Sequence, residues 1–378
     1  MNFKVCVYAI AKDEWRNVDR FMESAREADY ICVLDTGSSD GTVERLLEWA
    51  LPGSGVIVER REVIPWRFDE ARNLSLELIP LDTDICVSFD LDEVLRPGWR
   101  EALETAWSAD VCEGRYLCVC GRNSDGSPAT SFFRNKVHRR GGFAWKYPAH
   151  EVLVRVGPGG AAAGGGVVDV PGMVAEHLPD GSKDRGGYLA LLELGADENP
   201  GDARCAHYLG REYMYRGMWG EAIGELERHL ALPAAAWAEE RCASMRYLSE
   251  CWRCKGRPDL AMGWARKALA ELVTLRENWF ACEKAAYSLG DWRGVVYYGE
   301  MADTIGVRSG SCISEADAWG SALYDYLSIG YWYMGLQGKA LEAAGRALAL
   351  NSGDGRIRAN VDLLGLEVCG GEKGADGA

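Results

Sequence analysis

The pattern of apolar and polar residues divides the chain into a first part of alternating strands and helices and a second part that is helical throughout. Short β-branched runs predict four early strands: Phe3–Ile10, Tyr30–Asp35, Val56–Glu62 and Asp84–Asp90. Amphipathic stretches predict helices near residues 14–28, 41–50, 69–79 and 97–108. This alternation predicts a mostly parallel sheet with helices on both faces.

After Asp110 the pattern changes to strands without intervening helices. The expected strands are Arg115–Cys120, Thr130–Arg134, Glu151–Val156 and Val167–Glu176. Strands that follow one another in this way favour a mixed or antiparallel extension of the sheet. The low-complexity segment Gly157–Gly166 is expected to be a flexible hairpin tip.

The helical part repeats itself. Small and aromatic residues recur around the turn glycines Gly217, Gly256, Gly290 and Gly335, in the manner of tetratricopeptide repeats, whose period is about 34 residues. Uneven spacing of these glycines predicts insertions in two connections. A helix near residues 355–367 should cap the stack. The expected organisation is an α/β domain at 1–184, an all-α tetratricopeptide-repeat domain at 185–368 and a disordered tail at 369–378.

Charge, apolar run length and cysteine content each disfavour particular classes of protein. The formal charge of −15 disfavours coating of nucleic acid and binding to anionic membranes. No apolar run approaches the ~20 residues that span a bilayer, and the N-terminus lacks a signal-peptide core. We therefore expect a cytoplasmic protein without membrane insertion. The 13 cysteines lie in apolar stretches and predict no disulfide framework. Cys251 and Cys254 are expected to pack within a helix rather than bind metal.

Two strand ends carry candidate chemistry. Asp35 ends a predicted strand and precedes a Gly/Ser turn, at the sheet edge where α/β folds bind ligands. The alternative is that Ser38–Asp40 only cap the next helix. Asp90 and Asp92 follow another apolar strand, and carboxylates so placed suit Mg²⁺ or Mn²⁺ and a bound phosphate. The alternative there is a solvated acidic turn.

Four ordered motifs give the chain a family resemblance. The segments Ala9–Glu14, Asp35–Thr42, Phe68–Asn73 and Asp90–Asp92 resemble those of the family-two glycosyltransferases of GT-A fold, over about residues 3–185. His150–Glu151 and His177 are similar to the histidine-containing motifs of one subgroup. Fusion to tetratricopeptide repeats is similar to peptide S-glycosyltransferases, and lipopolysaccharide-core glycosyltransferases are also similar.

The resemblance implies a GT-A, Rossmann-like mixed sheet that binds a nucleotide sugar across its edge. A UDP-sugar is favoured and a GDP-sugar is an alternative, with Mn²⁺ or Mg²⁺ as cofactor. It implies Glu151 as the catalytic base. The implied metal ligands are Asp90, Asp92 and His177. The implied donor-binding residues are Ala9, Lys12, Glu14, Asp35, Arg72, Asn73, Asp90 and Leu91.

Several of these residues have plainer interpretations. Arg72 and Asn73 lie at helical spacing and could form a surface face. His177 could be an ordinary structural histidine beside a strand. Glu151 could form a salt bridge to Arg139 or Arg140. If Glu151→Gln kept full activity, Asp125 in the loop at residues 123–126 would be the next residue to test as the base.

The leading functional hypothesis is a metal-dependent inverting glycosyltransferase. Its repeats would hold a peptide or protein acceptor on a concave surface through some of the aromatic residues Tyr208, Tyr215, Trp252 and Tyr331. Transfer to a glycan core or to a modified DNA base is an alternative. The DNA alternative depends on a local basic cluster, Lys136, His138, Arg139, Arg140 and Lys146. A repeat scaffold with an inactive transferase domain is the non-enzymatic alternative, and a homodimer is compatible with each.

Overall fold

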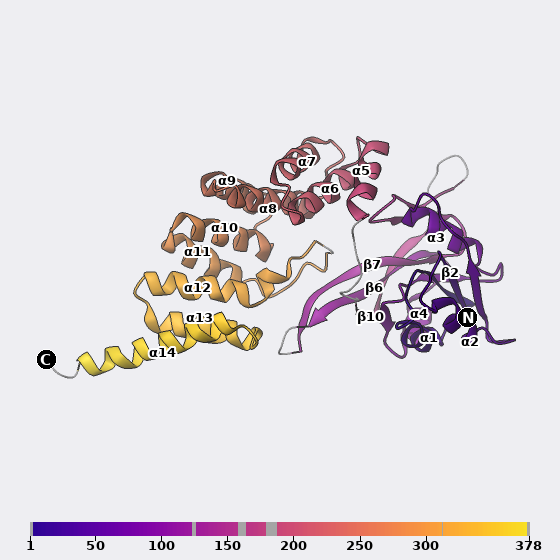
Figure 1. The fold of residues 1–378 in the computed structure, drawn as a ribbon, viewed down its shortest axis with the longest axis horizontal. Coiled ribbons are helices and arrows are strands. Elements are labelled where there is room, and N and C mark those ends of the chain that lie inside the picture. The colour runs from indigo at the N-terminus through magenta and orange to yellow at the C-terminus, as the bar shows by residue number, and fades with distance from the viewer. Residues whose placement is uncertain (1–2, 123–125, 158–163, 179–186, 312, 376–378) are drawn as a thin grey trace. The chain divides into compact units, whose positions relative to one another are not determined.

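The chain folds into two compact units, shown as a ribbon in Figure 1. The computed structural model describes residues 3–122, 126–157, 164–178, 187–311 and 313–375. Residues 1–121 and 131–195 form the first unit, and residues 122–130 and 196–378 form the second. The boundary between residues 195 and 196 lies within helix α5, Tyr188–Glu198, whereas the predicted boundary follows residue 184.

The first unit contains an eight-stranded sheet with the order β3-β2-β1-β4-β7-β6-β10-β5. The first four strands are β1 Val5–Ala11, β2 Tyr30–Asp35, β3 Val56–Arg60 and β4 Ile85–Ser88. They run parallel to one another, which confirms the predicted parallel part of the sheet. The extension is mixed, as expected. It consists of β5 Glu93–Leu95, β6 Val111–Arg122, β7 Pro128–Arg139 and β10 Gly166–His177, of which β7 runs antiparallel to β4 and β10 parallel to β6. The short strand β5 was not predicted.

Helices cover both faces of the parallel part. On β1, Val5, Val7 and Ala9 face one side and Cys6 and Tyr8 the other, since successive side chains of a strand alternate. Three helices pack on the first side, namely α1 Val18–Ala25, α2 Thr42–Trp49 and α4 Trp99–Ala106; α3 Phe68–Glu77 packs on the other. Helix α3 therefore reaches the sheet edge from the face opposite α1.

One predicted strand departs from the expected sheet. β9, Val152–Arg155, pairs with β8, Phe143–Lys146, in a separate two-stranded sheet. The loop between them holds Tyr147 and His150 at positive φ angles of 83° and 51°, a conformation that side chains disfavour. This turn joins β8 to β9 within the separate sheet. The centre of the predicted Gly-rich tip, residues 158–163, lies outside the described residues.

The second unit is a stack of antiparallel helix pairs (Figure 1). The pairs are α6 Ala203–Tyr215 with α7 Trp219–Ala231, α8 Ala238–Cys254 with α9 Pro258–Glu271, α10 Arg276–Leu289 with α11 Trp292–Asp303, and α12 Ser321–Tyr333 with α13 Gln337–Leu350. The four predicted turn glycines each join the two helices of a pair, with φ between 69° and 74°, angles that glycine adopts without strain. The tetratricopeptide-like organisation is thus confirmed.

The repeat unit differs from expectation at its end. Helix α14 runs Gly355–Ala375, beyond the predicted 355–367, since no proline interrupts its backbone. Residues 376–378 of the predicted disordered tail lie outside the described ranges. In the part of the chain that the structure describes, no helix is long and apolar enough to cross a membrane.

Candidate functional site

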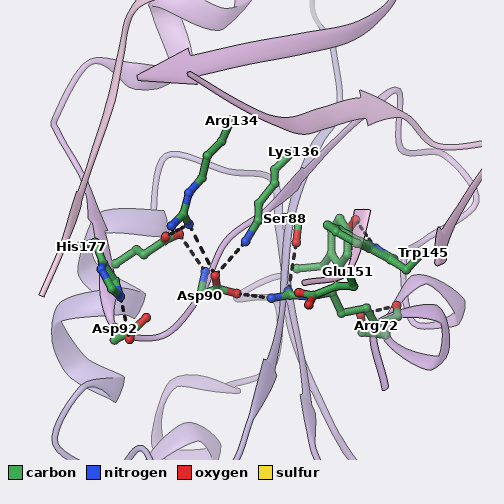
Figure 2. Close-up of polar contacts among 12 residues, drawn as sticks. Arg72, Ser88, Asp90, Asp92, Arg134, Lys136, Trp145, Glu151 and His177 are labelled. Atoms are coloured by element: carbon green, nitrogen blue, oxygen red, sulfur yellow. Dashed lines mark hydrogen bonds and ion pairs between the residues drawn. The ribbon is translucent and has the colours of Figure 1, made fainter. Parts of the chain in front are cut away.

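The candidate site lies at the carboxyl edge of the parallel strands. β1 has β2 on one side and β4 on the other, so the order of the strands reverses at this point, where α/β sheets bind ligands. Asp35 ends β2, and Asp90 and Asp92 follow β4. Figure 2 shows the polar side chains that gather beyond β4.

A buried arginine joins two of the predicted acids. Arg72 Nη2 donates to Asp90 Oδ1 at 2.6 Å, and Arg72 Nε donates to Glu151 Oε1 at 2.5 Å. Its side chain is only 6% exposed, and its guanidinium lies over the ring of Trp145 at 4.9 Å. Arg72 therefore lies between two acids and positions them, and its predicted contact with a ribose or diphosphate stays a prediction.

Two further cations reach Asp90 from strand β7. Lys136 Nζ donates to Asp90 Oδ2 at 2.7 Å, and Arg134 Nη1 lies 3.7 Å from the same oxygen. Burial acts to raise the pKa of the Asp90 carboxyl, but Arg72, Lys136 and Arg134 outweigh it and hold that pKa well below its usual range. Asp90 is therefore a carboxylate with three cationic neighbours.

Arg134 also forms an ion pair with Glu93, whose side chain is fully buried. Burial, followed by the neighbouring charge of Asp90, raises the pKa of Glu93. The backbone N–H of Asp90 donates to Glu93 Oε2 at 3.2 Å. Glu93 thus fixes both the backbone of Asp90 and one of the cations that face it.

Asp92 and His177 form a separate pair. His177 Nε2 lies 3.1 Å from Asp92 Oδ2, and Figure 2 shows this pair apart from the Asp90 cluster. The backbone N–H of Leu178 donates to the Asp92 carbonyl at 2.8 Å, which holds β10 beside the acidic turn. Hydrogen bonds to Asp92 and then Cys120 raise the pKa of His177 to about 10. A metal would have to displace the imidazole proton in order to bind there.

The predicted set of three metal ligands is not assembled. Asp90 points into the cationic cluster, whereas Asp92 and His177 pair with each other, and no group of three metal-ligating side chains gathers among the described residues. One carboxylate and one imidazole can nevertheless hold a cation that takes its other ligands from water and substrate phosphates, as Mg²⁺ commonly does. The residues therefore fit a metal shared with a phosphorylated substrate, and not a closed protein cage.

Helix α3 holds strand β8 and the loop before β9 through Asn73 and Phe68. Asn73 Nδ2 donates to the Trp145 carbonyl at 2.9 Å, and the Trp145 N–H donates to Asn73 Oδ1 at 2.8 Å. The Phe68 N–H donates to the Pro148 carbonyl at 3.0 Å. Both ends of the Asn73 amide therefore hold strand β8, just before the loop that carries Glu151, and contact of Asn73 with a ribose or diphosphate stays a prediction.

Three other predicted donor ligands are occupied or buried. The side chains of Ala9 and Leu91 lie in the apolar core at 0% and 2% exposure and offer a ligand no surface. Asp35 is also fully buried, and its Oδ1 accepts from the N–H groups of Gly37 and Ser38 at 3.0 and 3.1 Å. This carboxylate shapes its own turn, a role that was not predicted from the sequence.

Lys12 and Glu14 remain at the edge beyond β1. Lys12 is exposed, with its Nζ over the ring of Trp66 at 5.9 Å. Glu14 accepts from Asn17 Nδ2 at 2.5 Å, and its N–H donates to Thr42 Oγ1 at 2.7 Å. Of the residues predicted to bind the base, these two are the ones placed near solvent.

The predicted basic cluster does not form a surface patch. His138 is fully buried, with its Nε2 2.9 Å from the Tyr8 hydroxyl. Arg139 donates to the carbonyls of Val111 and Ala109, and Arg140 donates to the carbonyls of Ile79 and Pro80. Lys136 pairs with Asp90, and Lys146 is the exposed member of the cluster. The DNA alternative therefore depends on fewer exposed cations than the sequence suggested.

Glu151 does form an ion pair, although with Arg72 and not with Arg139 or Arg140 as the alternative had it. The residues that sequence reasoning missed are Arg134 and Glu93, and the role of Lys136 at Asp90. Arg134 and Lys136 stand two apart on β7, which places both on one face of the sheet. That spacing was visible in the sequence, but the neighbouring strand was not.

Comparison with known proteins adds similarity in fold class alone. No protein-family model matches the sequence, and no curated protein matches it. Solved structures of repeat proteins align with part of the chain: MamA (16% identity, 44% of this chain and 88% of that one, TM-score 0.36), a thermophilic TPR protein of Thermus thermophilus (18%, 47% and 89%, 0.36) and YrrB, described as a TPR protein with an unusual peptide-binding site (16%, 46% and 81%, 0.35). At these identities and TM-scores the similarities say nothing about the function of this chain.

Proposed function

We propose that the first unit is a GT-A glycosyltransferase domain and that it transfers a sugar from a nucleoside diphosphate sugar to a macromolecular acceptor. The observation that carries the proposal is the region beyond β4, where a carboxylate–imidazole pair that can ligate a cation lies next to a cationic cluster. Asp92 and His177 lie 3.1 Å apart, and Lys136 and Arg134 face the neighbouring Asp90. A diphosphate leaving group carries negative charge. A metal ion held by the first pair and the cationic side chains of the cluster would both offset that charge.

The proposed reaction uses Glu151 as the base. Its Oε1 accepts from Arg72, whereas no described residue engages Oε2. Glu151 would take the proton of the acceptor as the acceptor atom attacks the anomeric carbon and the bond to the diphosphate breaks, with inversion at that carbon. When bound at Asp92 and His177, Mn²⁺ or Mg²⁺ would supply charge that offsets the departing diphosphate. Arg72 would keep Glu151 in place.

The donor half of the proposal is tested by thermal unfolding of the whole chain with a panel of UDP- and GDP-sugars, in Mn²⁺ and in EDTA. A ligand that binds only the folded state raises its apparent stability. We expect one nucleotide class to raise the midpoint in Mn²⁺ and to do so much less in EDTA. The absence of any shift across the panel would favour the inactive-scaffold alternative.

A peptide acceptor would lie on the repeat unit. A cavity of about 500 Å³ there is lined by residues of α6, α7, α8 and α10 and of the connection before α12. Tyr215, with 65% of its surface exposed, lines this cavity. Tyr208 and Tyr331 are core residues at 6% and 8% exposure, and Trp252 packs against the core between helices. Of the four aromatics predicted to select the acceptor, Tyr215 is thus the one that lines this cavity.

Replacement of Tyr215 by alanine should raise KM for the peptide acceptor roughly 10-fold and leave donor affinity unchanged, because an exposed tyrosine contributes area to binding without holding the fold. Steady-state kinetics with varied acceptor measure this. Tyr297→Ala is the matched control, since Tyr297 is 55% exposed on α11 and does not line the cavity. Equal effects of the two substitutions would argue against this cavity as the acceptor site.

A further inference from the structure

Both carboxylate oxygens of Asp90 accept hydrogen bonds from cationic side chains. Its Oδ1 accepts from Arg72 at 2.6 Å, and its Oδ2 accepts from Lys136 at 2.7 Å with Arg134 at 3.7 Å. A metal at this carboxylate would lie beside these cations, and like charges repel. The arrangement is therefore that of an anion held among cations.

The three cations are not equally accessible. Arg72 is 6% exposed and is fixed by Glu151, by Ser88 Oγ at 3.3 Å and by the ring of Trp145. Lys136 and Arg134 are 14% and 19% exposed, and Asp90 itself is 27% exposed. Solvent and a ligand can therefore reach Asp90 and the two β7 cations, while Arg72 anchors Asp90 from the inside.

Lys136 differs from Arg134 in its partners. Arg134 is shared between Asp90 and the buried Glu93. Among the residues that the structure describes, Asp90 is the partner of Lys136. If a ligand displaced the Asp90 oxygen, Lys136 would be able to pair with that ligand. Arg134 would still be held in position by Glu93.

We propose that Lys136 and Arg134 form the binding site for the diphosphate of the donor, and that the Asp90 carboxylate occupies this site when no donor is bound. The inference rests on the proposed function. A diphosphate offers more charge and more oxygen acceptors than a single carboxylate, and hydrogen bonds between ionised partners are the stronger ones. Asp90 then competes with the donor diphosphate for Lys136 and Arg134, whereas Asp92 and His177 are the residues that would ligate the metal.

The test is calorimetry of the full chain in EDTA with inorganic pyrophosphate and with UDP. Lys136→Gln should weaken both ligands about 10-fold or more, as expected for loss of a charged hydrogen bond, and Lys136→Arg should restore most of the affinity. Asp90→Asn should bind pyrophosphate more tightly than the unmodified protein, since the competing charge is gone while the amide oxygen still accepts from Arg72. Circular dichroism checks that each variant is folded.

The matched control is Lys4→Gln, which removes a lysine before the amino end of β1, at the opposite edge of the sheet. Weaker pyrophosphate binding by Asp90→Asn, or equal binding by Lys136→Gln and Lys4→Gln, would overturn the inference. If pyrophosphate binds as expected and no nucleotide sugar does, the anion site stands and the proposed function fails. If UDP binds and Lys136→Gln leaves that binding unchanged, the function stands and the anion site fails. Binding of neither ligand in EDTA refutes the anion site, and the panel of nucleotide sugars in Mn²⁺ then decides the proposed function.

Discussion

Replacement of Glu151 by glutamine should lower the rate of sugar transfer by roughly 10²–10⁴-fold, the usual contribution of general-base catalysis. Glutamine keeps an oxygen that can accept from Arg72 Nε, now 2.5 Å from Glu151, so the loop and the Arg72–Asp90 pair should stay in place. What is lost is the group that takes the acceptor proton. Donor affinity, measured by calorimetry, should be unchanged. The whole loss of activity should appear as a lower kcat in steady-state kinetics.

The matched control is Glu113→Gln. Glu113 also forms an ion pair with an arginine, Arg155, and its side chain is 13% exposed against 12% for Glu151. It should therefore report the loss of a half-buried ion pair without loss of a base. A cysteine acceptor would make the effect of Glu151→Gln smaller at high pH, because a thiol ionises near pH ~8.5 without help. Full activity of Glu151→Gln toward a hydroxyl acceptor at neutral pH would exclude the role. Asp125, the alternative base, lies outside the described residues.

Asp92→Asn should weaken the binding of the donor in Mn²⁺ by about 10²-fold or more. Even the partners that orient metal ligands commonly contribute roughly 10- to 100-fold to metal affinity, and Asp92 would be a ligand itself. Its carboxylate is 27% exposed and lies 3.1 Å from His177 Nε2. Titration calorimetry of the favoured nucleotide diphosphate, in Mn²⁺ and in EDTA, measures the effect directly.

Two comparisons make this result specific. Asp169→Asn removes an acid of the same unit that is 43% exposed and paired with Arg115, and it should leave Mn²⁺-dependent binding intact. Asp90→Asn should not mimic Asp92→Asn, because Asp90 faces cations and Asp92 faces the histidine. Equal donor affinity of the unmodified chain in Mn²⁺ and EDTA would remove the metal from the mechanism. The β7 cations would then be the main counter-charge of the diphosphate.

Local sequence was enough to place the scaffold. β-branched runs and helical periodicity predicted the four parallel strands and the helices that follow them, because these patterns depend on residues a few positions apart. The turn glycines of the repeats were identified for the same reason, since each is required by a left-handed turn within one helix pair. Strand β5 was not predicted, because three residues are too few to show a periodic pattern. The separate β8–β9 sheet was not predicted either, because local periodicity does not specify which strands pair.

Site residues were predictable by position but not by role. Asp90, Asp92, Glu151 and His177 do lie around one sheet edge, as the motifs implied. Their partners could not be predicted, because Asp90 is separated from Arg72 by 18 residues and from Lys136 by 46, and the three meet only through strand order. Asn73 shows the same limit: its motif position suggested a ligand, and its amide clamps a backbone 72 residues away.

The sequence by itself determined an α/β unit followed by paired helices and marked the strand ends that carry acids, since periodicity, glycine turns and strand-end carboxylates are local properties. Only the tertiary structure decided that Asp90 is held by three cations while Asp92 pairs with His177. Residues two apart in the chain end in different electrostatic surroundings because β7 lies beside β4 and β10 is held against the Asp92 turn. Charge interactions depend on distance in space, and no pattern within one segment specifies which strand becomes its neighbour.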